Sequence, residues 1–198
     1  MRKLMMLATA SALMLGVPAV AQNMGQAGAQ AGGATGGTMS AADVGAAPMT
    51  GTSSANYAAW AANSDMYEIQ SSKLALSRSK NNGVKGLARE MITDHTTTTK
   101  SLMAALPKTN PKVPKPPMKL SADNAAKIAA LKSAPADGFD SLYLQQQMQA
   151  HQLAWSLHQG YAQDGTDPAL RQVASTAVPI IEKHIQHLKA GPQAMTGM

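Results

Sequence analysis

The amino-acid sequence predicts an all-α fold, in which four long helices form a bundle of two helical hairpins. Apolar residues recur at helical spacing in four long stretches of the chain after residue 55. Asparagine, glycine and proline separate these stretches, as they do at helix ends. Alternation of β-branched residues, which is typical of strands, never lasts four residues.

The first 21 residues have the three parts of a secretory signal peptide. Arg2 and Lys3 form a basic start, residues 4–17 are apolar, and residues 19–21 read Ala-Val-Ala, a small-residue cleavage site. We therefore expect cleavage after Ala21 and a periplasmic or secreted bacterial product. The apolar run is shorter than the roughly 20 residues of a membrane-spanning helix, so no integral membrane span is expected in the mature chain.

Residues 22–54 are rich in glycine and alanine, and Asp43 is their only charged residue. Such a segment has too little apolar surface to offset the entropy lost on ordering. The sequence therefore predicts a disordered tether over residues 22–54, a folded domain over residues 55–190 and a flexible tail over residues 191–198.

The first hairpin is expected to contain helices from residue 56 to about residue 80 and from residue 84 to residue 106. Asn81, Asn82 and Gly83 mark the turn between them, and Pro107 ends the second helix. The apolar positions of the second stretch follow the spacing of a helix with one buried face.

The connection to the second hairpin is long and rich in proline. Five prolines between residues 107 and 117 exclude a helix there, whereas Ser121 can cap a short helix over residues 122–132. The third long helix is expected over residues 139–163, and the fourth from Asp167-Pro168 to residue 190. A crossover of this length can run along the whole bundle, which is the ferritin-like arrangement of four helices.

Composition excludes some classes of function. The chain has no cysteine, so disulfide bonds and thiolate chemistry are excluded. The formal net charge is +6, of which Arg2 and Lys3 supply two units. The remaining basic residues are not interleaved with aromatic residues, so no nucleic-acid partner is expected.

Four motifs carry a resemblance to a known family. They read EIQSSKLAL from residue 68, VKGLAREMITDH from residue 84, GFDSLYLQQQMQAH from residue 138 and LRQVASTAVPIIEKH from residue 170. With this order and spacing the chain resembles the exported bacterial family catalogued as domain of unknown function 4142. The resemblance implies a ferritin-like bundle, export and a set of polar residues: Glu68, Asp94, His95, Tyr143, Gln147, His151 and His184.

Helix geometry places Glu68, His95, His151 and His184 near mid-height of the bundle, where bundles of this kind hold metals. Three imidazoles and one carboxylate suit a single zinc, copper or iron ion. Since the chain lacks the two Glu-x-x-His pairs of a di-iron site, ferritin-type iron oxidation is not expected.

The alternative is a buried hydrogen-bond network that binds no ion. Asp94, Tyr143 and Gln147 would belong to this network, and Glu68 is the expected partner of His95. His158 and His187 lie closer to helix ends and are expected at the surface.

Two functions follow from these alternatives. The first is a non-enzymatic exported bundle with a binding role in the envelope or in stress, with an unknown partner. The second is a bundle that holds one metal ion.

Overall fold

The computed structural model describes residues 39–191. These residues form six α-helices and one 3-10 turn, and no strand occurs among them. The predicted signal peptide, residues 22–38 of the predicted tether and residues 192–198 of the predicted tail lie outside this range. None of the helices described is long and apolar enough to span a membrane.

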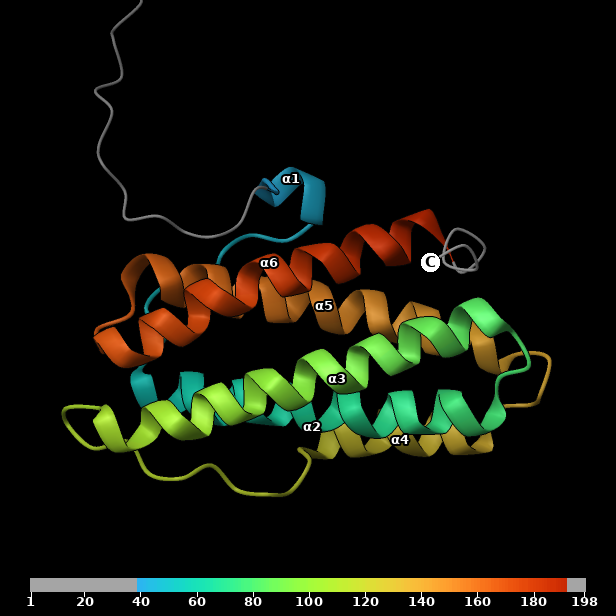
Figure 1. The fold of residues 1–198 in the computed structure, drawn as a ribbon, viewed down its shortest axis with the longest axis horizontal. Coiled ribbons are helices and arrows are strands. Elements are labelled where there is room, and N and C mark those ends of the chain that lie inside the picture. The colour runs from blue at the N-terminus through green and yellow to red at the C-terminus, as the bar shows by residue number, and fades with distance from the viewer. Residues whose placement is uncertain (1–38, 192–198) are drawn as a thin grey trace, which may run out of the picture. The chain divides into compact units, whose positions relative to one another are not determined.

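Four long helices form the bundle: α2 (Ser54–Arg78), α3 (Asn82–Ala105), α5 (Phe139–Asp164) and α6 (Pro168–Ala190). Both α2 and α6 pack against α3 and α5, so the hairpin of α2 and α3 lies against the hairpin of α5 and α6 (Figure 1). The side chains of Ser53, Asn81 and Asp167 accept hydrogen bonds from backbone N–H groups in the first turns of α2, α3 and α6. These caps fix where the helices begin. The predicted all-α bundle is confirmed.

The crossover follows from the directions of the helices. Helices α3 and α5 run the same way in Figure 1, so the chain must return along the bundle between them. It does so through the 3-10 turn η1 (Leu106–Lys108), an extended segment and helix α4 (Ala122–Ser133), which packs against α2 and α5. Arg78 of α2 donates a hydrogen bond to the carbonyl of Lys132 at 3.0 Å, which holds the end of α4 to the bundle.

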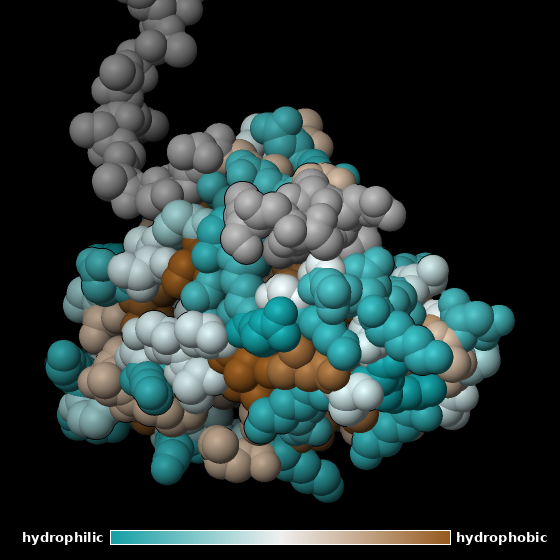
Figure 2. Space-filling model, turned by 45° about the vertical axis from the view of Figure 1, so that its right-hand side comes forward, coloured by the Kyte–Doolittle hydropathy of each residue, from teal (hydrophilic) through white to brown (hydrophobic). Residues whose placement is uncertain are grey.

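The interior of the bundle has apolar ends and a polar middle. One apolar cluster includes Tyr57, Leu102 and Leu170, and another includes Val84 and Phe139. Between them lies a layer of buried polar side chains: Asp65, Glu68, Ser71, Ser72, His95, Gln147, His151 and His184. On the outside, Figure 2 shows a mainly hydrophilic face with a patch of hydrophobic side chains near its centre.

Residues 39–53 correct the predicted boundary of the tether. This segment, named here the N-terminal strap, contains the short helix α1 (Ala41–Val44) and packs on α5 and α6. Val44 is buried in a cluster with Trp155 and Ile181. The Met49 N–H donates to the carbonyl of Ser156 at 2.8 Å. The strap orders although it has little apolar surface, because its polar backbone groups bond to side chains and backbone of the bundle.

One glycine permits this close approach. A Cβ atom at Gly160 of α5 would lie 2.1 Å from the carbonyl oxygen of Met49. No side chain fits in that space, so the strap can cross α5 only at a residue without a Cβ.

Candidate metal centre

Three histidines from three different helices meet in the polar middle of the bundle. His95 lies on α3, His151 on α5 and His184 on α6, and all three are buried. Their ring centroids are 5.1 to 5.5 Å apart. One ring nitrogen of each lies within 4.8 Å of those of the other two.

The ring of His95 is oriented by Asp65 of α2. The Nδ1 atom of His95 lies 2.8 Å from the Oδ1 atom of Asp65. The carboxylate of Asp65 also accepts hydrogen bonds at 2.9 Å from the hydroxyl of Thr98, at Oδ1, and from that of Thr99, at Oδ2. A carboxylate that accepts from several donors requires the proton on Nδ1 of His95. The neutral form of His95 therefore carries its lone pair on Nε2, and this atom has no hydrogen-bond partner among the described residues. The prediction that Glu68 is the partner of His95 is therefore wrong. The partner is Asp65, which precedes Glu68 by about one turn of α2.

The other two rings are held in the same manner. His151 donates from Nδ1 to the carbonyl oxygen of Gln147 at 2.8 Å, and His184 donates from Nε2 to Asp94 Oδ2 at 3.0 Å. Each neutral ring therefore has its lone pair on the other nitrogen. These two nitrogens, His151 Nε2 and His184 Nδ1, face each other at 3.1 Å. Two lone pairs at that distance repel unless a proton or a metal ion lies with them.

Burial argues against a proton in that gap. Burial, together with the charge of the neighbouring His95, lowers the pKa of His151 to about 3. Burial and the neighbouring histidines also place the pKa of His184 far below its ordinary value. Both rings are thus neutral at pH 7. Burial also acts to lower the pKa of His95, but the hydrogen bond and charge of Asp65, together with the charges of Glu68 and Asp94, outweigh that effect, so the net change is a raised pKa. A proton therefore competes with a metal ion for Nε2 of His95.

Glu68 adds a carboxylate to the centre. It is fully buried, its Oε1 atom lies 3.8 Å from Nδ1 of His151, and neither of its oxygens has a hydrogen-bond partner among the described residues. Burial raises the pKa of Glu68 to about 7, although His95 acts to lower it. An unpartnered buried carboxylate is costly unless a cation compensates it.

The geometry of these residues is compatible with a bound metal ion. Two imidazole nitrogens bound to tetrahedral zinc at about 2.0–2.1 Å lie roughly 3.4 Å apart, close to the 3.1 Å between His151 and His184. The pair of Asp65 and His95 has the arrangement in which a carboxylate orients a metal-binding imidazole. Three imidazoles with Glu68 nearby match the ligand types of zinc, copper and ferrous iron.

The remaining predicted polar residues surround the centre. The Nε2 atom of Gln147 donates to Ser71 Oγ at 3.0 Å, and the hydroxyl of Tyr143 bonds to that of Ser72 at 2.9 Å. Tyr143 packs in the apolar cluster around Phe139 rather than against the histidines. Tyr143 therefore reaches the polar layer only through the bond of its hydroxyl to Ser72, and it does not contribute to the centre.

Two predictions about histidines at helix ends had different outcomes. His158 is buried, contrary to the prediction, and its Nδ1 atom bonds to the hydroxyl of Tyr57 at 3.0 Å. Burial lowers the pKa of His158 to about 4. His187 is half-buried at the edge of α6, where its Nδ1 atom lies 3.0 Å from Glu90 Oε2.

Asp65 is the site residue that the sequence prediction missed. The signal was present in α2, where buried residues alternate at spacings of three and four: Ala58, Ala61, Asp65, Glu68, Ser72 and Ala75. Asp65 continues this stripe, so its carboxylate faces the interior as that of Glu68 does.

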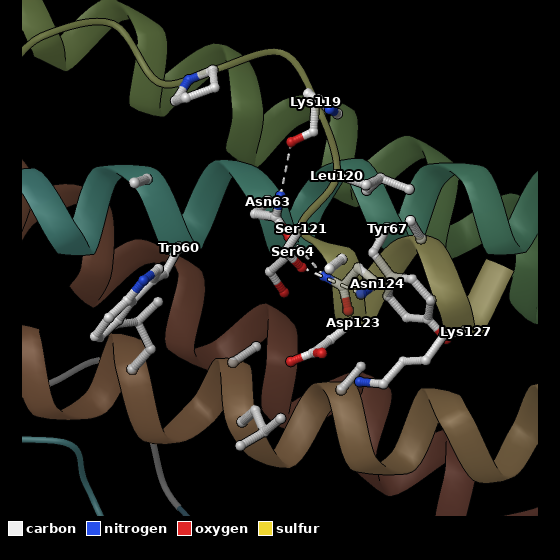
Figure 3. Close-up of a pocket in the computed structure, with 18 of the residues that line it drawn as sticks. Trp60, Asn63, Ser64, Tyr67, Lys119, Leu120, Ser121, Asp123, Asn124 and Lys127 are labelled. Carbon is white, nitrogen blue, oxygen red and sulfur yellow. Dashed lines mark hydrogen bonds between the residues drawn. The ribbon is translucent and has the colours of Figure 1, made fainter.

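A groove of about 770 Å³ lies on another face of the bundle, between α2, α4 and α5. Figure 3 shows Trp60 at one end and Tyr67 and Lys127 at the other. Asn63 joins the walls, donating to the carbonyl of Lys119 at 3.0 Å and accepting from Asn124 at 2.8 Å. The three histidines do not line this groove.

A family model described as "Domain of unknown function (DUF4142)" matches residues 39–190. No curated protein and no solved structure matches the chain. The matched region begins at the first residue of the N-terminal strap and ends with the last residue of α6, so it includes both the strap and the centre.

Proposed function

We propose that this chain, which belongs to the family described as domain of unknown function 4142, binds one transition-metal ion through His95, His151 and His184. Glu68 would supply a fourth ligand or balance the charge of the ion from beside it. Asp65, Gln147 and Asp94 would hold the three rings in position.

One observation carries the proposal. Each of the three rings has one nitrogen bonded to an acceptor oxygen. The other nitrogens of His151 and His184 face each other at 3.1 Å, and a ring nitrogen of each of the three buried histidines lies within 4.8 Å of those of the other two. In a closed hydrogen-bond network the facing nitrogens of His151 and His184 would share a proton, yet both rings have lowered pKa values. A metal ion accepts all three lone pairs at once and leaves no repulsion.

The ligand set favours particular ions. Imidazole nitrogens with one carboxylate suit zinc, copper and ferrous iron, whereas magnesium and calcium prefer oxygen ligands. Among these three ions, intrinsic affinity decreases from copper to zinc to ferrous iron. Because copper would bind most tightly in any such site, the ion that the protein holds in the cell depends on which metal is supplied.

Burial favours a held ion over an open catalytic one. A catalytic zinc site keeps one position open to water and substrate, whereas the three histidines and Glu68 are all buried. We therefore propose an ion-binding role in which the ion stabilises the bundle or is carried by it.

The test is metal analysis of the purified protein, followed by titration with zinc, copper or ferrous iron. We expect one ion per chain and, at a free ion concentration of 100 times Kd, a stabilisation of about 2.7 kcal/mol. This corresponds to a rise in Tm of roughly 5–11 °C for a domain of this size.

His95→Gln should weaken binding about 100-fold or more, because one of three nitrogens is lost. His158→Gln is the matched control, since His158 is a buried histidine bonded to Tyr57 instead. If wild type and His95→Gln bind the ion equally, or if chelator and added ion leave the Tm of wild type unchanged, the proposal is wrong.

A further inference from the structure

The oxygens that hold the three rings differ in their exposure. The side chain of Asp65 is 7% exposed, and the residue Gln147, whose backbone carbonyl holds His151, is 0% exposed, whereas the side chain of Asp94 is 24% exposed. Of these three groups, Asp94 alone joins a buried histidine to solvent. It does so on the face between α3 and α6.

A lysine covers this face. The Nζ atom of Lys183 lies 2.8 Å from Asp94 Oδ2 and 3.0 Å from Glu90 Oε1, so one ammonium bridges both carboxylates. His187 completes the rim, with its Nδ1 atom 3.0 Å from Glu90 Oε2. Glu90 and Asp94 are one turn apart on α3, and the next residue of α6 after Lys183 is His184.

We propose that the face formed by Glu90, Asp94, Lys183 and His187 is the route by which a divalent metal ion reaches the histidines, with the Lys183 ammonium as a plug that the ion displaces. This inference rests on the proposed function, because it assigns the path to the same centre.

The charges and contacts on this face support the first steps of the path. Glu90 and Asp94 present two anionic oxygens at the surface that attract a cation. An ammonium and a dication repel each other, so both cannot occupy the space between the carboxylates. The side chain of Lys183 is 45% exposed and can turn into solvent without leaving a buried charge behind.

Asp94 then connects the surface to the centre. Its Oδ2 atom contacts both Lys183 and Nε2 of His184, and the other ring nitrogen of His184 faces His151. An ion that replaces Lys183 beside Asp94 therefore lies against the ring that borders the buried space.

The experiment measures how fast the full chain binds cobalt(II), whose visible absorbance reports coordination by histidine. Stopped-flow traces are recorded for wild type, Lys183→Met and Lys189→Met. Lys189 is the control because it is another exposed lysine of α6, and it bonds to the carbonyl of Asp43 instead. Lys183→Gln serves as a second variant, and circular dichroism confirms that all of them are folded.

We expect Lys183→Met and Lys183→Gln to bind cobalt about tenfold faster than wild type, since a repelling charge leaves the entry route. Lys189→Met should remain within about twofold of wild type, because its charge is away from the route. Equal association rates in all four proteins would overturn the route while leaving the centre intact. If equilibrium titration detects no cobalt bound to any of them, the proposed function fails and the route fails with it.

Discussion

Replacement of Glu68 by glutamine is expected to stabilise the ion-free protein at pH 8 and to weaken binding of the ion. Glutamine has nearly the same shape as glutamate and cannot ionise. The buried carboxylate of Glu68 has no hydrogen-bond partner among the described residues, so its charged form is unfavourable in the folded state.

The magnitude follows from the pKa of Glu68. Burial raises this pKa from 4.5 to about 7 in the folded protein. Stability from a group with a raised pKa is fully present below the pKa of the unfolded state and is lost as pH rises through the pKa of the folded state. The loss between pH 4.5 and pH 8 is about 3 kcal/mol.

Glutamine removes this loss. With chelator present, the free energy of unfolding of Glu68→Gln should therefore exceed that of wild type at pH 8 by up to about 3 kcal/mol. Near pH 4.5, where Glu68 is protonated, the two proteins should differ little. In a melting experiment the difference at pH 8 corresponds to a rise in Tm of roughly 6–12 °C.

The assay is urea unfolding at pH 4.5 and pH 8, with chelator and with saturating zinc. In zinc the advantage of the variant should shrink or reverse, because the ion compensates the charge of Glu68 in wild type only. A variant that is equally destabilised at both pH values and in both media would refute the reasoning. Glu68 would then have a structural partner that glutamine does not satisfy.

Two further predictions concern the strap and the response to acid. Gly160→Ala should release the N-terminal strap, because a Cβ atom there meets the backbone of Met49. Limited proteolysis of this variant should therefore cut within residues 39–53. The control is Gly86→Ala, where a Cβ atom meets open space: it should change stability little or raise it by up to about 1 kcal/mol, and its strap should stay resistant to protease. The ion-free protein should lose stability as pH falls below 6.5, because the unfolded state protonates His151, His158 and His184 while their lowered pKa values keep them neutral in the folded state. Glu68 opposes this with one proton, and the raised pKa of His95 acts in the same direction as Glu68. At most two protons remain, which gives a net slope of up to about 2.7 kcal/mol per pH unit between pH 4.5 and 6. Urea titrations that give a flat profile over this range would contradict the assignment of neutral buried histidines.

The long helices could be predicted from the sequence because their signals are local. Asp167 followed by Pro168 marks the first turn of α6, and the predicted start of that helix matches the structure. Pro107 and the prolines after it end the first hairpin in the same way. Such signals depend on a few neighbouring residues, so the ends of these helices follow from the local sequence and not from the packing of the bundle.

The pairing of side chains across helices could not be predicted with the same accuracy. Asp65 and Glu68 are one turn apart on α2, and a small axial shift between α2 and α3 decides which of them meets His95. That shift depends on how side chains of both helices interlock, which the spacing within one helix does not specify. Spacing within the helices therefore predicted that His95, His151 and His184 lie close together, but it gave the wrong carboxylate as the partner of His95.

The strap was missed for a different reason. Its composition lacks large apolar residues, yet a capping box of Ser40 and Asp43 marks the start of α1. The contacts that order it come from α5 and α6, more than 100 residues away along the chain. A composition rule considers only the segment itself and cannot detect partners so distant.

The three histidines are divided between the two halves of the chain. His95 stands on the first hairpin, whereas His151 and His184 stand on the second. Each hairpin is built from local contacts, and the docking of one on the other is the step that joins distant segments. An ion held by all three rings would link the two hairpins across the crossover. Because the hairpins could not then separate until the ion left His95, the ion-bound protein would open more slowly. In a chain without cysteine, a metal ion would thus act as the cross-link that a disulfide bond provides in other proteins.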